Sequence, residues 1–119
     1  MKRLKKRNEV SMENYLIADK TIETIDKSKD NKIRFVAKVR DFDEKTGTFV
    51  VSGGSDKQVT CLPPVEGELK LHSGEIVLVT AKVMPTEEEN FELMSEYVRE
   101  ISEREYSAFN KYLKTKETL

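Results

Sequence analysis

The side chains best suited to catalysis or metal binding are few in this sequence and lie far apart. Cys61 and His72 are the single cysteine and the single histidine, so neither has the partners that a nucleophile or a metal site requires. Cys61 falls in an alternating segment and is predicted to be buried, and His72 precedes a Ser-Gly turn. The chain has no GxxxxGK[ST] loop, no HExxH motif and no nucleophile elbow. We therefore expect no enzyme, no cofactor, no metal and no small-molecule substrate.

A second chemistry is the binding of phosphate by basic side chains. Lysines and arginines alternate with apolar residues between positions 32 and 40, and another lysine starts a later predicted strand. The candidate nucleic-acid contacts are Arg34, Lys38, Arg40 and Lys57. Strong single-strand binding also needs exposed aromatic rings, but the phenylalanines of the predicted strands are flanked by apolar residues and are expected in the core. With a net charge of −1 and a glutamate-rich segment from 87 to 105, we expect weak binding or none by the chain alone.

The clearest local signal lies near the C-terminal end, where Ser102 and Glu105 have the spacing of a capping box. In this motif the serine side chain accepts a hydrogen bond from the glutamate N–H, and the glutamate carboxylate accepts one from the serine N–H. Ile101 and Tyr106 have the spacing of a hydrophobic staple across the same helix start. The pattern predicts a helix over residues 102–116.

Apolar and aromatic residues continue along one face of this predicted helix. A helix of about a dozen residues is marginal in water by itself, so this face must pack against something. The candidate partner contacts are Ile101, Tyr106, Phe109, Tyr112 and Leu113. Two hypotheses remain: the face joins the helices of a partner in a small bundle, or it covers the open end of the chain's own β domain. We favour the partner.

These side chains would be positioned by a small β domain. Five segments show the alternation or the β-branched and aromatic enrichment of strands, and turn residues or prolines separate them. The predicted strands cover residues 33–40, 48–52, 57–62, 75–84 and 91–98. Their order favours an all-β, five-stranded Greek-key OB-fold barrel over an SH3-like barrel, and the first strand is long enough to join two sheets. A short N-terminal helical segment carrying Ile22 and Ile25 is expected to cover the barrel.

The length of 119 residues allows one domain. We predict a basic disordered tail over residues 1–13, an OB-fold domain over residues 14–101 and an oligomerisation helix over residues 102–116. The tail either directs nuclear import or contacts nucleic acid, or it only keeps the protein soluble; these alternatives stay open. No apolar run is long enough to span a bilayer and no apolar segment follows the tail, so we expect neither membrane insertion nor export.

Taken in order, these segments resemble the small, third subunit of replication protein A and its paralogues in telomere complexes. The resemblance is carried by strand residues 33–39, hairpin residues 46–54, apolar strand residues 77–83 and the helix from Glu103 after the last strand. It extends over most of the chain and rests on the order and spacing of the elements.

The resemblance implies an OB barrel within a heterotrimer, where the C-terminal helix joins helices of a middle and a large OB-fold subunit that hold most of the single-stranded DNA. It also implies a nuclear role in replication, repair or telomere maintenance, including assemblies associated with telomerase. The sequence does not separate replication protein A from its telomeric paralogues. The alternative hypothesis is an autonomous OB-fold domain that binds single-stranded nucleic acid through the basic face of its first strand.

Overall fold

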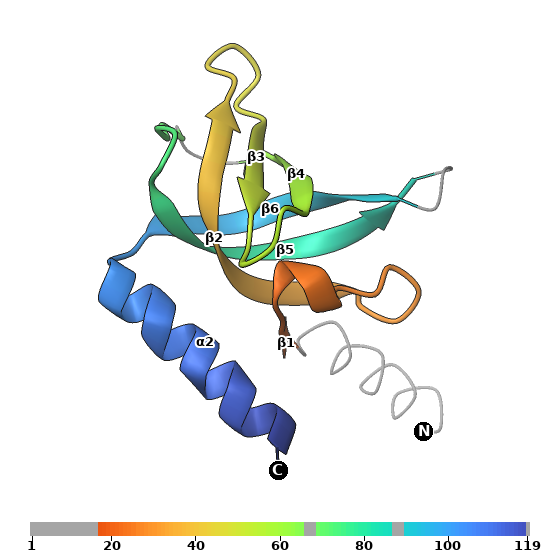
Figure 1. Ribbon diagram of the computed structural model, residues 1–119. Helices are drawn as coiled ribbons and strands as arrows, with labels where there is room; N and C mark the ends of the chain where they lie inside the picture. Colours follow the sequence, from red (N-terminus) through yellow and green to blue (C-terminus); the bar gives the residue numbers. More distant parts are fainter. Residues whose placement is uncertain (1–16, 66–68, 87–89, 119) are drawn as a thin grey trace, which may run out of the picture.

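The computed structural model describes residues 17–65, 69–86 and 90–118. The predicted basic tail over residues 1–13, the first residues of the predicted OB-fold domain and part of the acidic loop before the last strand lie outside the described residues. The described chain forms a β barrel with a long helix beside it (Figure 1).

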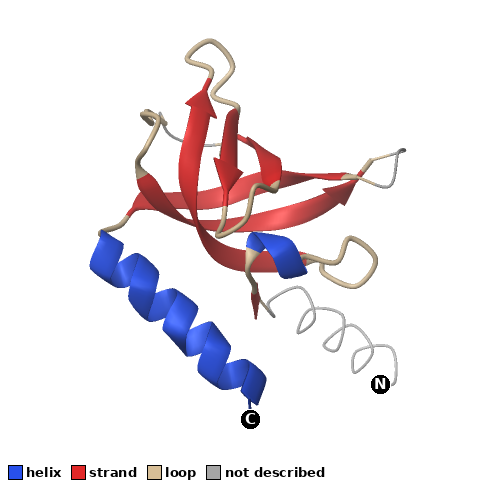
Figure 2. Ribbon diagram, in the orientation of Figure 1, coloured by secondary structure: helices blue, strands red, loops and turns tan. Residues whose placement is uncertain are grey.

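The barrel consists of five strands: β2 (Lys32–Phe42), β3 (Phe49–Ser52), β4 (Gln58–Leu62), β5 (Ile76–Pro85) and β6 (Phe91–Glu100). A two-residue strand, β1 (Ala18–Asp19), pairs in parallel with β2 and is followed by a 3-10 turn, η1 (Ile22–Thr24). The long helix, α2 (Glu103–Thr118), follows β6. Figure 2 shows helical structure only before and after the barrel strands in the part of the chain that the structure describes.

The longest strand, β2, joins the two halves of the barrel. Its first part, from Lys32 to Lys38, pairs antiparallel with β5, and its last part, from Lys38 to Phe42, pairs antiparallel with β3. Lys38 is therefore opposite both Ser52 and Ile76. A parallel pairing of β4 with β6 closes the barrel. This is the predicted Greek-key order, with the first strand taking part in both sheets as expected.

The core follows from the alternation, because every second side chain of a strand points to the same face. In β2 the apolar members of the pattern are buried and the basic members Arg34, Lys38 and Arg40 are exposed. The largest fully buried side chains are Phe35, Phe49, Ile22, Ile33 and Leu93. Phe91 is buried as well, so the prediction that the strand phenylalanines lie in the core is confirmed.

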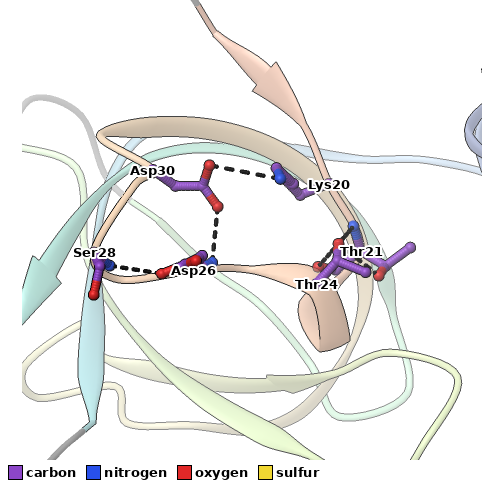
Figure 3. Close-up of polar contacts among 6 residues, drawn as sticks. All are labelled: Lys20, Thr21, Thr24, Asp26, Ser28 and Asp30. Carbon is purple, nitrogen blue, oxygen red and sulfur yellow. Dashed lines mark hydrogen bonds and ion pairs between the residues drawn. The ribbon is translucent and has the colours of Figure 1, made fainter. Parts of the chain in front are cut away.

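The segment before β2 packs onto the barrel core, as predicted. Ile22 and Ile25 are both buried there, although the helical turn is a short 3-10 turn rather than an α-helix. Polar contacts shape the loop that follows (Figure 3). The backbone N–H of Asp26 donates to the Asp30 carboxylate at 2.8 Å, and that carboxylate pairs with the Lys20 ammonium at 3.6 Å. These contacts tie the two ends of the segment together.

The bounds of the elements differ from the predicted ones by one or two residues at several ends. β6 continues to Glu100, beyond the predicted end at residue 98, because Arg99 and Glu100 still pair with β5. The helix ends at Thr118 rather than at residue 116. β1 was not predicted, since two residues are too few to show a period.

Candidate partner interface

The first turn of α2 is held by the predicted capping box, which the structure confirms. The N–H of Glu105 donates to Oγ of Ser102 at 3.1 Å, and the N–H of Ser102 donates to the Glu105 carboxylate at 3.2 Å. The same carboxylate pairs with Arg99 of β6 at 3.4 Å. The hydrogen bond from the Ser102 backbone, followed by the charge of Arg99, holds the pKa of Glu105 below its usual range. The start of α2 is therefore tied to the last strand.

The helix α2 packs against a strip of apolar side chains on the outer wall of the barrel. Val36 of β2 and Ile76 of β5 form a cluster there with Ile101, and all three side chains are buried. Tyr106 and Phe109 of α2 pack against this cluster. It is separate from the barrel core. The helix thus covers apolar side chains that the strand pattern would otherwise leave in water.

This packing narrows the predicted partner contacts. Leu113 is only 6% exposed and Ile101 is buried, so both lie within the chain's own fold. Tyr106 and Phe109 are half-buried, and Tyr112 remains 49% exposed. The chain's own barrel therefore covers much of this helix face in the free chain, and the contact with a partner stays a prediction. The helix contacts the outer wall and not the open end of the barrel.

The exposed remainder forms a continuous surface, which we call the helix–strand face. The rings of Phe109 and Tyr112 lie 6.3 Å apart between centroids, and the Arg34 guanidinium carbon lies 6.0 Å from the Phe109 centroid. Across the sheet, Arg34 is opposite Thr80, and Thr80 is opposite Tyr97 of β6. Tyr97 is 52% exposed. The face comprises these five residues, from three strands and the helix.

Sequence reasoning missed Tyr97 as a member of this surface. Its neighbour Val98 packs against the barrel core, so the alternation of β6 places Tyr97 on the outer wall. A large aromatic side chain at an outward strand position was the available signal.

The structure separates the four predicted nucleic-acid contacts. Nε and Nη2 of Arg34 donate to the Asp19 carboxylate at 2.8 and 3.1 Å, which ties this guanidinium to β1. Lys57 lies elsewhere, with its ammonium 5.6 Å from the ring centroid of the first residue of β6. Lys38 and Arg40 lie together beside the first turns of α2. The predicted basic stripe is therefore not one continuous site.

The surroundings of Lys57 are those of a structural turn. The Glu23 carboxylate accepts hydrogen bonds from the hydroxyl of Ser55 at 2.6 Å and from its backbone N–H at 3.2 Å. Burial alone would raise the pKa of Glu23, but these hydrogen bonds and the charge of Lys57 outweigh it and lower the pKa. Glu23 thus holds η1 against the turn between β3 and β4, and the charge of Lys57 favours the ionised carboxylate.

The residues that first suggested chemistry lie apart in the structure. Cys61 is fully buried, as predicted, and burial raises the pKa of its thiol. His72 is exposed beside a turn. Within residues 17–65, 69–86 and 90–118, no three His, Cys, Asp or Glu side chains gather in a way that would hold a metal ion. Among the described residues, there is also no helix with the length and apolar character needed to cross a membrane.

A hollow of about 410 Å³ lies between the C-terminal half of α2 and the chain around β1. Asp19, Thr21, Leu113 and Lys116 are among the residues that line it. The far end of α2 therefore lies over open space, whereas its first turn is tied to β6.

A comparison with protein-family models found no match, and a comparison with curated proteins found none either. Solved structures do include similar folds. The crystal structure of telomere capping protein Ten1 from Saccharomyces pombe has a TM-score of 0.67 at 16% identity, and the match covers 87% of this chain and 100% of that chain. A chain of the S. pombe Stn1–Ten1 complex has a TM-score of 0.59 at 19% identity, with coverage of 83% and 93%.

A chain of a replication protein A heterotrimer bound to single-stranded DNA has a TM-score of 0.55 at 16% identity, covering 67% of this chain and 66% of that chain. Together these likenesses confirm the predicted fold class, a closed five-stranded OB barrel with a C-terminal helix, to which β1 adds one strand. The similar structures are those of the proteins that the sequence resemblance indicated.

Proposed function

We propose that this chain is a non-catalytic structural subunit of a single-stranded-DNA-binding heterotrimer of the replication protein A type. The observation that carries the proposal is the helix–strand face, which exposes about half of Tyr97 on β6 and of Tyr112 in the C-terminal half of α2. The OB fold supports it, because similar folds occur in the Stn1–Ten1 complex and in a replication protein A heterotrimer bound to single-stranded DNA.

The chemistry of this face suits a protein partner. Tyr97 and Tyr112 project from different elements, and Phe109 lies beside Tyr112. Tyrosine supplies a large apolar ring with a polar tip and is enriched at the centres of interfaces. Arg34 is held in place by Asp19, so it presents a fixed guanidinium between the strands and the helix. A helix of a larger subunit lying along α2 would cover these rings together.

The partners in this proposal are middle and large OB-fold subunits, and these hold most of the DNA. The assembly acts in the nucleus, in DNA replication and repair or in telomere maintenance. The match to Ten1 covers that whole chain, whereas the match to the replication protein A chain covers 66% of it, which favours the telomere-capping version. Association with telomerase belongs to the same proposal.

The test is affinity purification of the tagged full chain from its own cells, followed by identification of the bound chains. The variant Tyr97→Asp with Tyr112→Asp places two charges on the helix–strand face and is expected to lose the larger OB-fold subunits while its melting temperature changes little. The matched control is Met84→Asp, which alters an exposed apolar side chain near the far end of β5. This control is expected to retain the complex.

Two results would contradict the proposal in different ways. If the double variant retrieves the same chains in the same amounts as the wild type, the interface lies elsewhere on the molecule. If the wild-type chain retrieves no OB-fold protein at all, the proposed function is wrong.

A further inference from the structure

Lys38 and Arg40 are the two predicted nucleic-acid contacts that the structure brings together. They lie on either side of buried Val39, so both side chains project outward from the wall of the barrel. The register between β2 and β3 shifts between Val39 and Asp41, which makes Arg40 the extra residue of a β-bulge. Bulges re-aim side chains relative to the regular pleat. Nε of Arg40 donates to Oγ of Ser52 at 2.6 Å, and this hydrogen bond fixes the position of the guanidinium group.

The two cations line a hollow of about 210 Å³ between the barrel wall and the first turns of α2. Gly53, Glu103 and Tyr106 also border it. In the described part of the chain, no carboxylate lies within ion-pair distance of either cation. The other two basic side chains of β2 are both ion-paired. Lys38 and Arg40 therefore keep charge available for a ligand.

Two unpaired cations beside an aromatic ring fit a nucleotide better than a simple anion. Phosphate oxygens pair with lysine and arginine, and the planar guanidinium matches phosphate in a fork geometry. A nucleobase stacks on an aromatic ring, and this stacking tolerates any base. Tyr106 is half-buried, so its ring is fixed by the apolar cluster below it while it borders the hollow.

We propose that this hollow binds one nucleotide of single-stranded DNA, with neighbouring phosphates at Lys38 and Arg40 and the base against Tyr106. Lys38 and Arg40 lie two residues apart on β2, so each cation can meet a different phosphate of the DNA strand. The proposal rests on the proposed function, because a subunit of such an assembly lies close to the strand that its partners hold. Glu103 repels phosphate at the rim, so the contact adds to the affinity of the partners and is weak alone.

The experiment measures the fluorescence anisotropy of a labelled oligothymidine with the full chain over a range of salt concentrations. Lys38→Gln with Arg40→Gln is expected to weaken binding about tenfold and to reduce the slope of log K against log salt by about 1.4, the loss of two phosphate contacts on a single strand. The matched control, Lys111→Gln with Lys114→Gln, removes the same charge from exposed positions of α2 outside the hollow. It is expected to weaken binding less than about threefold.

Two further variants test the ring and the opposing charge. Tyr106→Leu keeps an apolar side chain on the cluster but removes the stacking surface, and it is expected to weaken binding about fivefold or more. Glu103→Gln removes the carboxylate at the rim and is expected to strengthen binding. Thermal melting of each variant, followed by circular dichroism, establishes that it is folded.

Three results would overturn the nucleotide site: no oligothymidine binding by the wild-type chain at low salt, equal binding by the Lys38 and Arg40 variant, or an equal loss in both double variants. Retrieval of larger OB-fold subunits is measured for the same proteins. A variant that keeps its partners but loses DNA affinity supports the site. Failure of the wild type to retrieve partners refutes the proposed function, and the anisotropy of the isolated chain still decides the nucleotide site.

Discussion

Two adjacent residues of α2 allow the packing of the helix to be separated from its binding. Leu113 is buried within the chain's own fold, whereas Tyr112 is half-exposed. Truncation of a buried leucine to alanine costs about 2–5 kcal/mol, depending on how well the site collapses. Leu113 also lines the hollow below the end of α2, so neighbouring groups and water can move toward the space. We therefore expect Leu113→Ala to lower the free energy of unfolding by about 2.5 kcal/mol, in the lower part of that range.

The expected change in melting temperature follows from the size of the chain. For 119 residues, a loss of 1 kcal/mol corresponds to about 4 °C. Leu113→Ala should therefore melt about 10 °C below the wild type. Tyr112→Ala loses only the edge of the ring pair with Phe109, so we expect a loss of about 0.5 kcal/mol and a shift of about 2 °C. The measurement is thermal unfolding followed by circular dichroism, with urea titration as a second assay.

In the affinity purification, Tyr112→Ala should have a larger effect than Leu113→Ala, which is the reverse of their effects on the melting temperature. Tyr112→Ala is expected to weaken retrieval of the larger subunits, because the ring is on the helix–strand face. An unchanged melting temperature for Leu113→Ala would refute the docking of α2 on the barrel in the free chain. Equal destabilisation by the two variants would refute the assignment of Tyr112 to an open surface.

Further predictions concern the cap, the ion pairs and the core. Ser102→Ala removes the N-cap and should cost about 1 kcal/mol, and an unchanged midpoint in urea would contradict the capping role. The pKa of Glu105 is lower in the folded chain, so its contribution to stability is present above the ordinary pKa of glutamate and is lost as the pH falls through the folded value. Acid unfolding should consequently be shallower for Glu105→Gln, and identical acid profiles would show that the contribution is absent. Arg34→Gln breaks a surface ion pair and should cost less than about 1 kcal/mol while leaving oligothymidine affinity unchanged; a loss of DNA affinity would place Arg34 in the nucleotide site. Cys61 should react with a thiol reagent only on unfolding, and a fast reaction in native buffer would contradict its burial.

The elements that could be predicted are those whose signal is local. Alternation along β2 and the turn residues around it define the strands, and Ser102 with Glu105 defines the start of α2 within four residues of sequence. Both signals depend on neighbours along the chain. The structure agrees with the alternation of β2, because its outward basic side chains Arg34, Lys38 and Arg40 are exposed to water.

The surface on which α2 packs was harder to predict because it is assembled from distant segments. The signal was Val36, an apolar residue among the basic outward positions of β2, together with outward Ile76 of β5. These side chains come together only when β2 pairs with β5. Similarly, the candidate nucleic-acid contacts were predicted from the basic side chains of separate strands, whereas Asp19, which pairs with Arg34, lies on a two-residue strand without a periodic pattern.

The uneven support of α2 has a consequence for its dynamics. The first turn is held by its cap, by Arg99 and by the Ile101 cluster, while the last turns lie over the hollow beside β1. Local opening should therefore start at the C-terminal end, and amide hydrogens near Lys116 should exchange faster than those near Tyr106. A partner that packs against Tyr112 would suppress this fraying. Binding would then stabilise the least stable cooperative unit of the chain, so protection from exchange at that end would report complex formation.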